Sequence, residues 1–127
     1  MPCEDVLTVP AEVLVPAALE NSITEDIAKN IKAKIIVEGA NGPTTAEADA
    51  VLEEKGTVVV PDILANSGGV IVSYFEWVQN LQNYYWSEEE VNARLETTIV
   101  SAFNTVWNCS ENYKTSLRLG AYITAVD

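Results

Sequence analysis

Three short apolar runs constrain the fold of this chain more than any other feature. A helical pattern follows each of them. The runs are EVLVP at 12–16, KIIVEGA at 34–40 and TVVVPDIL at 57–64. They are rich in Val and Ile without regular polar alternation, which is typical of parallel strands covered on both faces. The stretches 23–34 and 42–56 between them are helical in pattern. The order strand, helix, strand, helix, strand predicts a parallel sheet with right-handed crossovers, and at least half of a doubly wound α/β fold.

Capping signals support the two connecting helices. Thr24 is a favoured N-cap residue, and acidic residues follow it in the first turn. Thr44 and Glu47 have the spacing of a capping box, and Gly56 supplies a stop. The sequence therefore predicts one helix before and one helix after the second strand along the chain.

Only helices are expected after the third strand. The first runs from Gly69 to about Gln82, and a longer one follows Ser87, which has capping-box spacing to Glu90. The segment 115–127 is also helical in pattern. An apolar stripe at helical spacing marks the buried side of the long helix: Val91, Leu95, Ile99, Ala102 and Val106.

Composition excludes several classes of function. The chain has 127 residues, 48% of them apolar, which suits one globular domain. Nineteen acidic and seven basic residues give a net charge of -12, which argues against a nucleic-acid partner. Histidine is absent, so imidazole acid–base chemistry, a Ser-His-Asp triad and the usual catalytic zinc site are excluded from this chain, and no metal site is predicted.

The cysteines and the hydropathy pattern bear on the compartment. Cys3 and Cys109 are far apart and have no metal-ligand or redox spacing. No secretory signal and no apolar run long enough to span a bilayer is present, so no membrane partner is expected. The sequence predicts a cytoplasmic protein with reduced thiols.

The three strand ends predict a ligand site. They read PAALEN at 16–21, EGANGPTT at 38–45 and PDILANSGG at 61–69, and each offers an asparagine beside small residues. Ligands of open parallel sheets bind outside the carboxyl ends of the strands. An asparagine amide both donates and accepts, which suits a carboxamide or a ribose hydroxyl. The alternatives are a common turn at Asn41-Gly42 and a helix cap at Asn66-Ser67.

The helix that follows the third strand is poorly built for stability alone. It begins with Gly68 and Gly69, each costing about 1 kcal/mol against alanine, and continues with β-branched residues. Ser73 and Glu76 lie among apolar neighbours, where we expect burial. A buried serine can bond the carbonyl one turn back, whereas an unpartnered buried carboxylate is costly. The sequence assigns no role to Glu76.

Longer strings of the sequence resemble a known family. VLVPAALEN, IKAKIIVEGANGPTT, VVVPDILANSGGVIVSYFEWVQN and YYWSEEEVN closely resemble the cofactor-binding domain of glutamate dehydrogenases, from the middle of that domain to near its C-terminus. Related amino-acid dehydrogenases share the Asn-x-Gly-Gly-Val element but not GANGPTT together with YFEWVQN. The resemblance implies an enzyme that converts L-glutamate to 2-oxoglutarate and ammonia and passes a hydride to NAD or NADP.

The resemblance also assigns site residues. It places Ala17 and Ala18 beside the cofactor, Asn41 on the nicotinamide-side ribose and Asn66 at the nicotinamide end. For the substrate, it implies that Val70 packs against glutamate and that the Ser73 hydroxyl holds its side-chain carboxylate. The fold implied is the distal half of a Rossmann-like doubly wound parallel sheet, three strands followed by C-terminal helices.

Parts of the family pattern are missing from the chain. The Gly-x-Gly-x-x-Gly phosphate turn is absent, and the catalytic lysine and aspartate belong to a substrate domain that precedes this region. The lysines of the chain, Lys55 included, read as solvated, so no catalytic residue is expected here. We expect a fragment, inactive alone, whose parent is a homohexamer. Residues 1–83 would be part of the dinucleotide-binding domain and 84–127 its C-terminal helical segment.

Two other functions are also compatible with the sequence. One is an amino-acid dehydrogenase of the same superfamily with an apolar substrate, against which a serine placed for a carboxylate argues. The other is a non-catalytic acidic α/β module that binds a protein through exposed aromatics. The residues concerned are predicted to be packing or subunit-interface residues: Tyr74, Phe75, Trp77, Tyr84, Tyr85 and Trp86.

Overall fold

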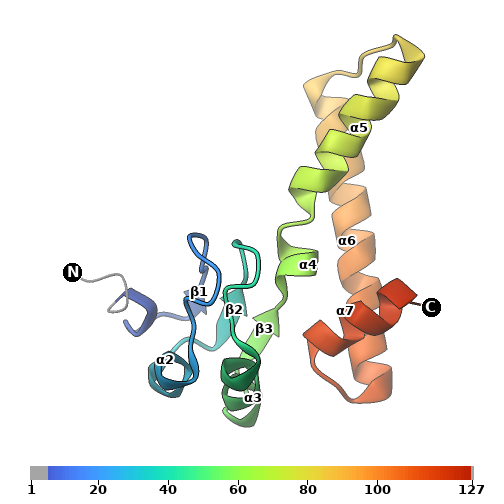
Figure 1. Ribbon diagram of the computed structural model, residues 1–127. Helices are drawn as coiled ribbons and strands as arrows, with labels where there is room; N and C mark the ends of the chain where they lie inside the picture. The colour runs from blue at the N-terminus through green and yellow to red at the C-terminus, as the bar shows by residue number, and fades with distance from the viewer. Residues whose placement is uncertain (1–5, 127) are drawn as a thin grey trace.

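The computed structural model describes residues 6–126, and its first unit is a three-stranded parallel sheet with two helices. The strands lie in the order β1-β2-β3 (Figure 1). Ile36 on the central strand pairs with Leu14 on one side and Val59 on the other. The elements are β1 (Val13–Leu14), α2 (Glu25–Asn30), β2 (Ile35–Val37), α3 (Ala46–Glu54) and β3 (Val58–Val60). The predicted order of strands and helices is confirmed.

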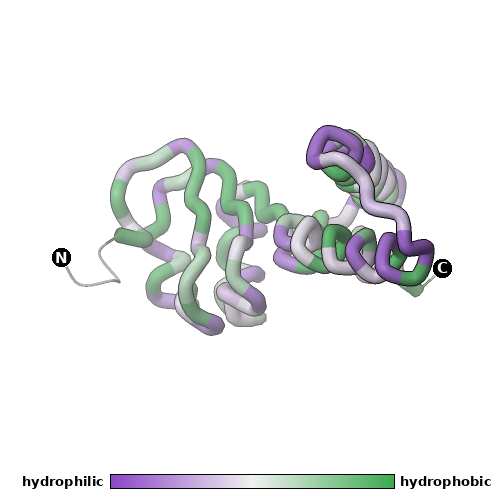
Figure 2. Tube along the Cα trace, turned by 90° about the horizontal axis from the view of Figure 1, so that it is seen from above, coloured by the Kyte–Doolittle hydropathy of each residue, from purple (hydrophilic) through white to green (hydrophobic). Residues whose placement is uncertain are grey.

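The second unit is helical. Its elements are α4 (Asp62–Ala65), α5 (Gly68–Gln82), α6 (Glu88–Tyr113) and α7 (Leu117–Val126). The α5–α6 hairpin extends away from the sheet, and α7 folds back along the lower half of α6 (Figure 1). Viewed from above, the two units stand side by side (Figure 2). Among the described residues, no helix is long and apolar enough to cross a membrane.

Two clusters of apolar side chains form the cores of these two units. The larger joins the sheet to α2 and α3 around Ile23, Ile36 and Leu52, each with no exposed surface. The smaller packs α4, α6 and α7 together through Leu64, Val106, Leu117 and Ala121, with Val60 of β3 against it. The last strand therefore belongs to both clusters and connects them.

The face of the sheet opposite α2 and α3 is largely uncovered within residues 6–126. This contradicts the prediction that the strands are covered on both faces. Val13, Ile35 and Val58 are neighbours across the sheet and remain 49%, 39% and 41% exposed. Two right-handed crossovers between strands in the order 1-2-3 place α2 and α3 on the same face. Only the end of β3 is covered on the other side, where Val60 meets the cluster that includes α7 residues.

Two local predictions are wrong. The strand predicted over 57–64 ends at Val60 and α4 follows, because Pro61 has no N–H to donate to the ladder. The N-cap of α3 is Thr45, whose hydroxyl accepts from the N–H of Ala48 at 3.2 Å, and not Thr44. Thr44 instead forms an isolated parallel bridge with Ile23, just before α2 and α3 begin.

Other sequence signals for the ends of helices are confirmed or partly confirmed. Ser87 and Glu90 form the predicted capping box of α6, and the predicted apolar stripe faces its packed side. Gly56 ends α3 with a φ of +71°. Thr24 occupies the N-cap of α2 as predicted, but its side chain makes no capping bond. Cys3 lies outside the described residues, and Cys109 is a partly exposed free thiol.

Candidate functional site

The carboxyl ends of the three strands surround an open cleft of about 600 Å³. Its lining residues are Ala17, Ala18, Glu20, Gly39, Ala40, Asn41, Asn66 and Val70. The cleft brings together five of the six residues predicted for the site, and Ser73 is the one outside its lining. The geometry gathers these residues at the edge where ligands of open parallel sheets bind, while their individual roles remain predictions.

Close backbone contacts explain the small residues at the floor of the cleft. The N–H groups of Gly39 and Ala40 both donate to the carbonyl of Pro16, at 3.0 and 2.9 Å. A Cβ on Gly39 would lie 3.1 Å from the Cβ of Ala17, closer than side chains normally approach. The first two strand ends are therefore packed directly against each other, and this packing favours glycine at position 39.

The two asparagines of the predicted site bind each other. The side-chain amide of Asn66 donates to Oδ1 of Asn41 at 2.6 Å and lies 3.4 Å from the carbonyl of Gly39. In the capping alternative for 66–67, Ser67 does occupy the N-cap of α5, but its side chain makes no capping bond and donates to the carbonyl of Leu64 at 2.8 Å. The turn alternative does hold, since Gly42 has a φ of +54°. Asn41 and Asn66 thus join the second and third strand ends.

The expected burial of Ser73 and Glu76 is wrong. α5 has no buried residue, and both side chains are exposed, because within residues 6–126 this helix packs mainly along the side that faces α6. The Ser73 hydroxyl donates to the carbonyl of Gly69 at 3.0 Å, the bond one turn back that was the alternative to a ligand role. Val70, one turn before Ser73 on the same face, is 69% exposed.

The glycine pair at the start of α5 has two different environments. A Cβ on Gly68 would lie 3.3 Å from Cδ1 of Ile99, so Gly68 lets α5 approach α6. A Cβ on Gly69 would meet no atom within 4 Å. Packing among the described residues explains the first glycine and not the second.

Replacing Gly69 by alanine is therefore expected to stabilise the chain by about 0.5–1 kcal/mol, because alanine loses less backbone entropy in a helix. Urea unfolding measures this change. The control is Gly68→Ala, whose Cβ would lie 3.3 Å from Cδ1 of Ile99, so crowding should cancel at least part of the same gain. A ligand that lies against the first turn of α5 would bind the Gly69→Ala variant more weakly despite its greater stability. Loss of stability in both variants would contradict the structural difference between the glycines.

A buried ion pair lies directly behind the cleft, and the sequence patterns did not reveal it. Glu38 follows β2 and has no exposed surface, and its carboxylate is held by both terminal nitrogens of Arg118, at 2.7 and 3.0 Å. Arg118 also binds Asp49 through Nε at 2.8 Å. Burial lowers the pKa of the guanidinium, but hydrogen bonds to Glu38 and then Asp49 outweigh it, so the pKa of Arg118 is raised.

The available signal for this pair was an acidic residue immediately after an apolar strand. Such a carboxylate, once buried, requires a cation, and Arg118 is one of two arginines in the chain. The partner lies 80 residues away, which no local spacing can reveal.

Lys55 is also not simply solvated, as the sequence suggested. Its ammonium group donates to three carbonyls at the end of α2, those of Ala28, Lys29 and Ile31, at 2.8, 3.1 and 2.7 Å. A cation at this position satisfies carbonyls that the helix leaves unpaired and opposes its dipole. Lys55 is therefore a structural contact between α3 and α2.

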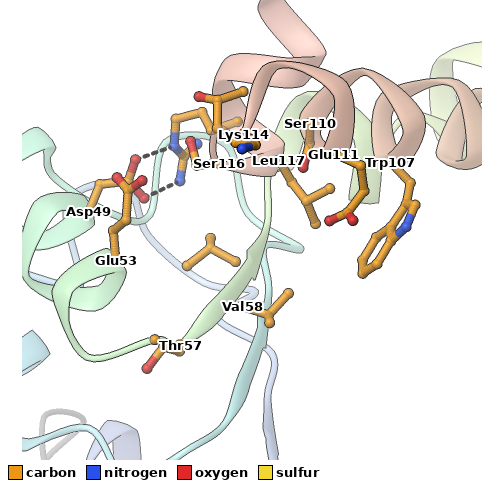
Figure 3. A pocket seen from close by; sticks show the side chains of 14 residues that line it. Asp49, Glu53, Thr57, Val58, Trp107, Ser110, Glu111, Lys114, Ser116 and Leu117 are labelled. Atoms are coloured by element: carbon orange, nitrogen blue, oxygen red, sulfur yellow. Dashed lines mark hydrogen bonds and ion pairs between the residues drawn. The ribbon is translucent and has the colours of Figure 1, made fainter.

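A second cavity, of about 330 Å³, lies at the other end of β3 (Figure 3). It is bounded by α3, the start of β3 and the α6–α7 turn, and the dashed lines at Asp49 mark its bonds to Arg118. Thr57 and Val58 place it at the amino end of the strand, away from the edge that binds ligands in such sheets. In residues 6–126 no cluster of three or more metal-ligating side chains occurs.

A parallel sheet with helices and a cleft of small residues and amides at its carboxyl edge is the arrangement of one half of a doubly wound α/β fold, in which ligands bind at that edge. Residues 1–127 match the family described as Glutamate/Leucine/Phenylalanine/Valine dehydrogenase. The chain belongs to this family.

Individual relatives agree with the family match. The chain is 54% identical over 123 residues to the NAD-specific glutamate dehydrogenase of Staphylococcus aureus (strain COL), covering 97% of this chain and 30% of that protein. The glutamate dehydrogenase of Peptoniphilus asaccharolyticus is 52% identical with a TM-score of 0.85, over 88% of this chain and 28% of that one. The hetero-hexameric glutamate dehydrogenase of Thermus thermophilus (Leu bound form) is 43% identical with a TM-score of 0.90, over 93% and 28%. The chain thus spans under a third of the length of these relatives.

Proposed function

We propose that this chain is part of an NAD-dependent glutamate dehydrogenase and supplies the nicotinamide-side and substrate-carboxylate-side wall of its active site. The reaction converts L-glutamate, NAD⁺ and water to 2-oxoglutarate, ammonia and NADH. The observation that carries the proposal is the cleft in which Ala17, Asn41 and Asn66 meet, in a chain 54% identical to an NAD-specific glutamate dehydrogenase. Residues 1–83 belong to the dinucleotide-binding domain and 84–127 form its C-terminal helical segment.

The cleft fits the uncharged nicotinamide and ribose end of a dinucleotide. Ala17 and Ala18 leave room for a flat ring. The bond between the asparagines uses an acceptor of Asn41 and a donor of Asn66, so each retains the other half of its amide for ribose hydroxyls or a carboxamide. Glu20 is the charged residue of the lining, and no Lys or Arg accompanies it there, which disfavours a phosphate group at this place.

The substrate would lie on the α5 side of the cleft. Val70 offers an exposed apolar contact, and Ser73 offers a hydroxyl one turn further along the same face. The nicotinamide ring, when bound, supplies the acceptor for the hydride that leaves the amine-bearing carbon. The groups of this chain orient and bind, and the proton-transfer residues come from another part of the polypeptide.

The relatives support the choice of cofactor. NAD rather than NADP is proposed because the curated relatives are NAD-specific. The rest of the same polypeptide is the first partner, and the enzyme is proposed to be a homohexamer in the cytoplasm. A screen of amino acids with the full-length protein and NAD tests the substrate. Faster oxidation of an apolar amino acid than of glutamate would contradict the proposal.

Asn66 gives the most direct test of the cofactor wall. In the full-length enzyme, Asn66→Ala is expected to raise the Michaelis constant for NAD by about 3–10-fold, because one neutral hydrogen bond contributes about 0.5–1.5 kcal/mol. The constant for glutamate should change much less, and steady-state kinetics with each reactant varied separates the two. Asn92→Ala, an exposed amide on α6, is the matched control. An unchanged NAD constant in Asn66→Ala would remove Asn66 from the site.

A further inference from the structure

The geometry points to Arg118 of α7 as a positioning residue for the candidate cleft, although it does not line the cleft. A continuous series of bonds, named here the relay, joins Arg118 to Glu38, Asp62 and Gly42, and Gly42 adjoins Asn41. The consequence for cofactor binding rests on the proposed function, whereas the relay itself is a property of the fold.

The first link is the bidentate pair between Arg118 and Glu38. Nη2 lies 2.7 Å from Oε1 and Nη1 lies 3.0 Å from Oε2, so both oxygens of the buried carboxylate are bound. This geometry fixes the plane and direction of the Glu38 carboxylate as well as its charge. An ammonium group at the same place would neutralise the charge without fixing the direction.

The second link runs from Glu38 to the third strand end. Oε2 of Glu38, already bound to Arg118, also accepts the N–H of Asp62 at 2.8 Å. Asp62 is the first residue of α4 and follows β3 after a single proline. The N–H of Glu38 donates to the carbonyl of Val60 at 3.1 Å, so the backbone already joins the ends of β2 and β3, and the Glu38 carboxylate adds a second bond that holds the start of α4.

The third link runs from Asp62 to the turn that carries Asn41. Oδ2 of Asp62 accepts the N–H of Gly42 at 2.8 Å, and Oδ1 accepts the N–H of Ile63 at 2.8 Å. The carbonyl of Gly42 accepts the N–H of Asn21 at 2.8 Å, so this residue is held from both sides. The backbone next to Asn41 is thus tied to the third strand end, where Asn66 lies.

Arg118 also forms an ion pair that does not lead to the cleft. Its pairs with Glu38 and with Asp49 are called the Glu38 arm and the Asp49 arm. Nε and Nη2 bind the two oxygens of Asp49 on α3, at 2.8 and 3.2 Å. Loss of the Asp49 arm should weaken the attachment of α7 without moving Gly42. Loss of the Glu38 arm should weaken the same attachment and also loosen the turn. This asymmetry separates a positioning role from a structural one.

Amide hydrogen exchange tests the relay without any activity. In Arg118→Lys, we expect the Gly42 amide to exchange about tenfold faster relative to the β2 amides. In Asp49→Asn, that ratio should stay within about twofold of the original chain even where the melting temperature falls. Equal ratios in the two variants would overturn the relay. The normalisation to β2 removes the contribution of global unfolding.

Kinetics of the full-length enzyme test the consequence. Arg118→Lys and Asp62→Asn should both raise the Michaelis constant for NAD by about 3–10-fold with a smaller change in kcat. Asp49→Asn and the exposed control Arg94→Lys should leave it within about twofold. If the constant instead follows the melting temperature across all variants, Arg118 acts only on stability. An original enzyme inactive on glutamate would overturn the proposed function, while Gly42 exchange would still decide the relay.

Discussion

Replacing Arg118 by methionine is expected to destabilise the chain by about 3–5 kcal/mol, the usual effect of removing one partner of a buried ion pair. The methionine leaves the Glu38 carboxylate fully buried, with the N–H of Asp62 as its remaining bond. Domains of this size have total stabilities of about 5–15 kcal/mol, so the loss is a large fraction. Denaturant unfolding of the original chain and the variant measures it.

A double variant separates the charge from the packing. Glu38→Gln together with Arg118→Met removes both charges of the buried pair, and we expect it to recover part of the loss, since Asp49 and Asp62 still lose their cation. The matched control is Arg94→Met, because Arg94 stacks on Trp86 at 4.2 Å on an exposed surface and should contribute only about 0.5–1 kcal/mol. Additive effects of the two single changes would show that the pair does not interact.

Features that depend on neighbouring residues could be predicted from the sequence. The three Val- and Ile-rich runs gave the strands, and the Ser87–Glu90 capping box gave the start of α6, because both signals act within a few residues. The cap of α3 was placed one residue early. The backbone of Thr44 pairs with Ile23, a contact 21 positions away along the chain, so the helix begins one residue later and Thr45 becomes its N-cap.

The same distinction applies to the site. Asn41 and Asn66 could be placed together because parallel topology alone brings strand ends to one edge. The ion pair between Arg118 and Glu38 could not be predicted from the sequence, because it depends on how α7 packs after a long helix. The apolar neighbours of Ser73 and Glu76 in the sequence led to a wrong prediction that these side chains are buried. A helix that packs on one side leaves the other side exposed, whatever residues it carries.

Ser73→Ala in the full-length enzyme is expected to raise the Michaelis constant for glutamate by at least about tenfold. A hydrogen bond from a hydroxyl to a carboxylate contributes about 1.5–3 kcal/mol, equivalent to about 10–100-fold. The Ser73 hydroxyl now donates to the carbonyl of Gly69 at 3.0 Å and has a single proton to give. Release of that bond on substrate binding offsets part of the gain, so the lower end of the range is expected.

The change at Ser73 should not act through stability. The side chain is exposed, and alanine is the better helix former, so the variant should unfold no earlier than the original. Thr105→Ala is the matched control, because Thr105 is an exposed helical hydroxyl bonded to the carbonyl four residues back at 2.9 Å. A glutamate carboxylate held by Ser73 requires that the glutamate constant rise far more than the NAD constant. Equal changes, or none, would mean that the hydroxyl serves only the bond to Gly69, and would leave an apolar amino acid as the better substrate for this wall.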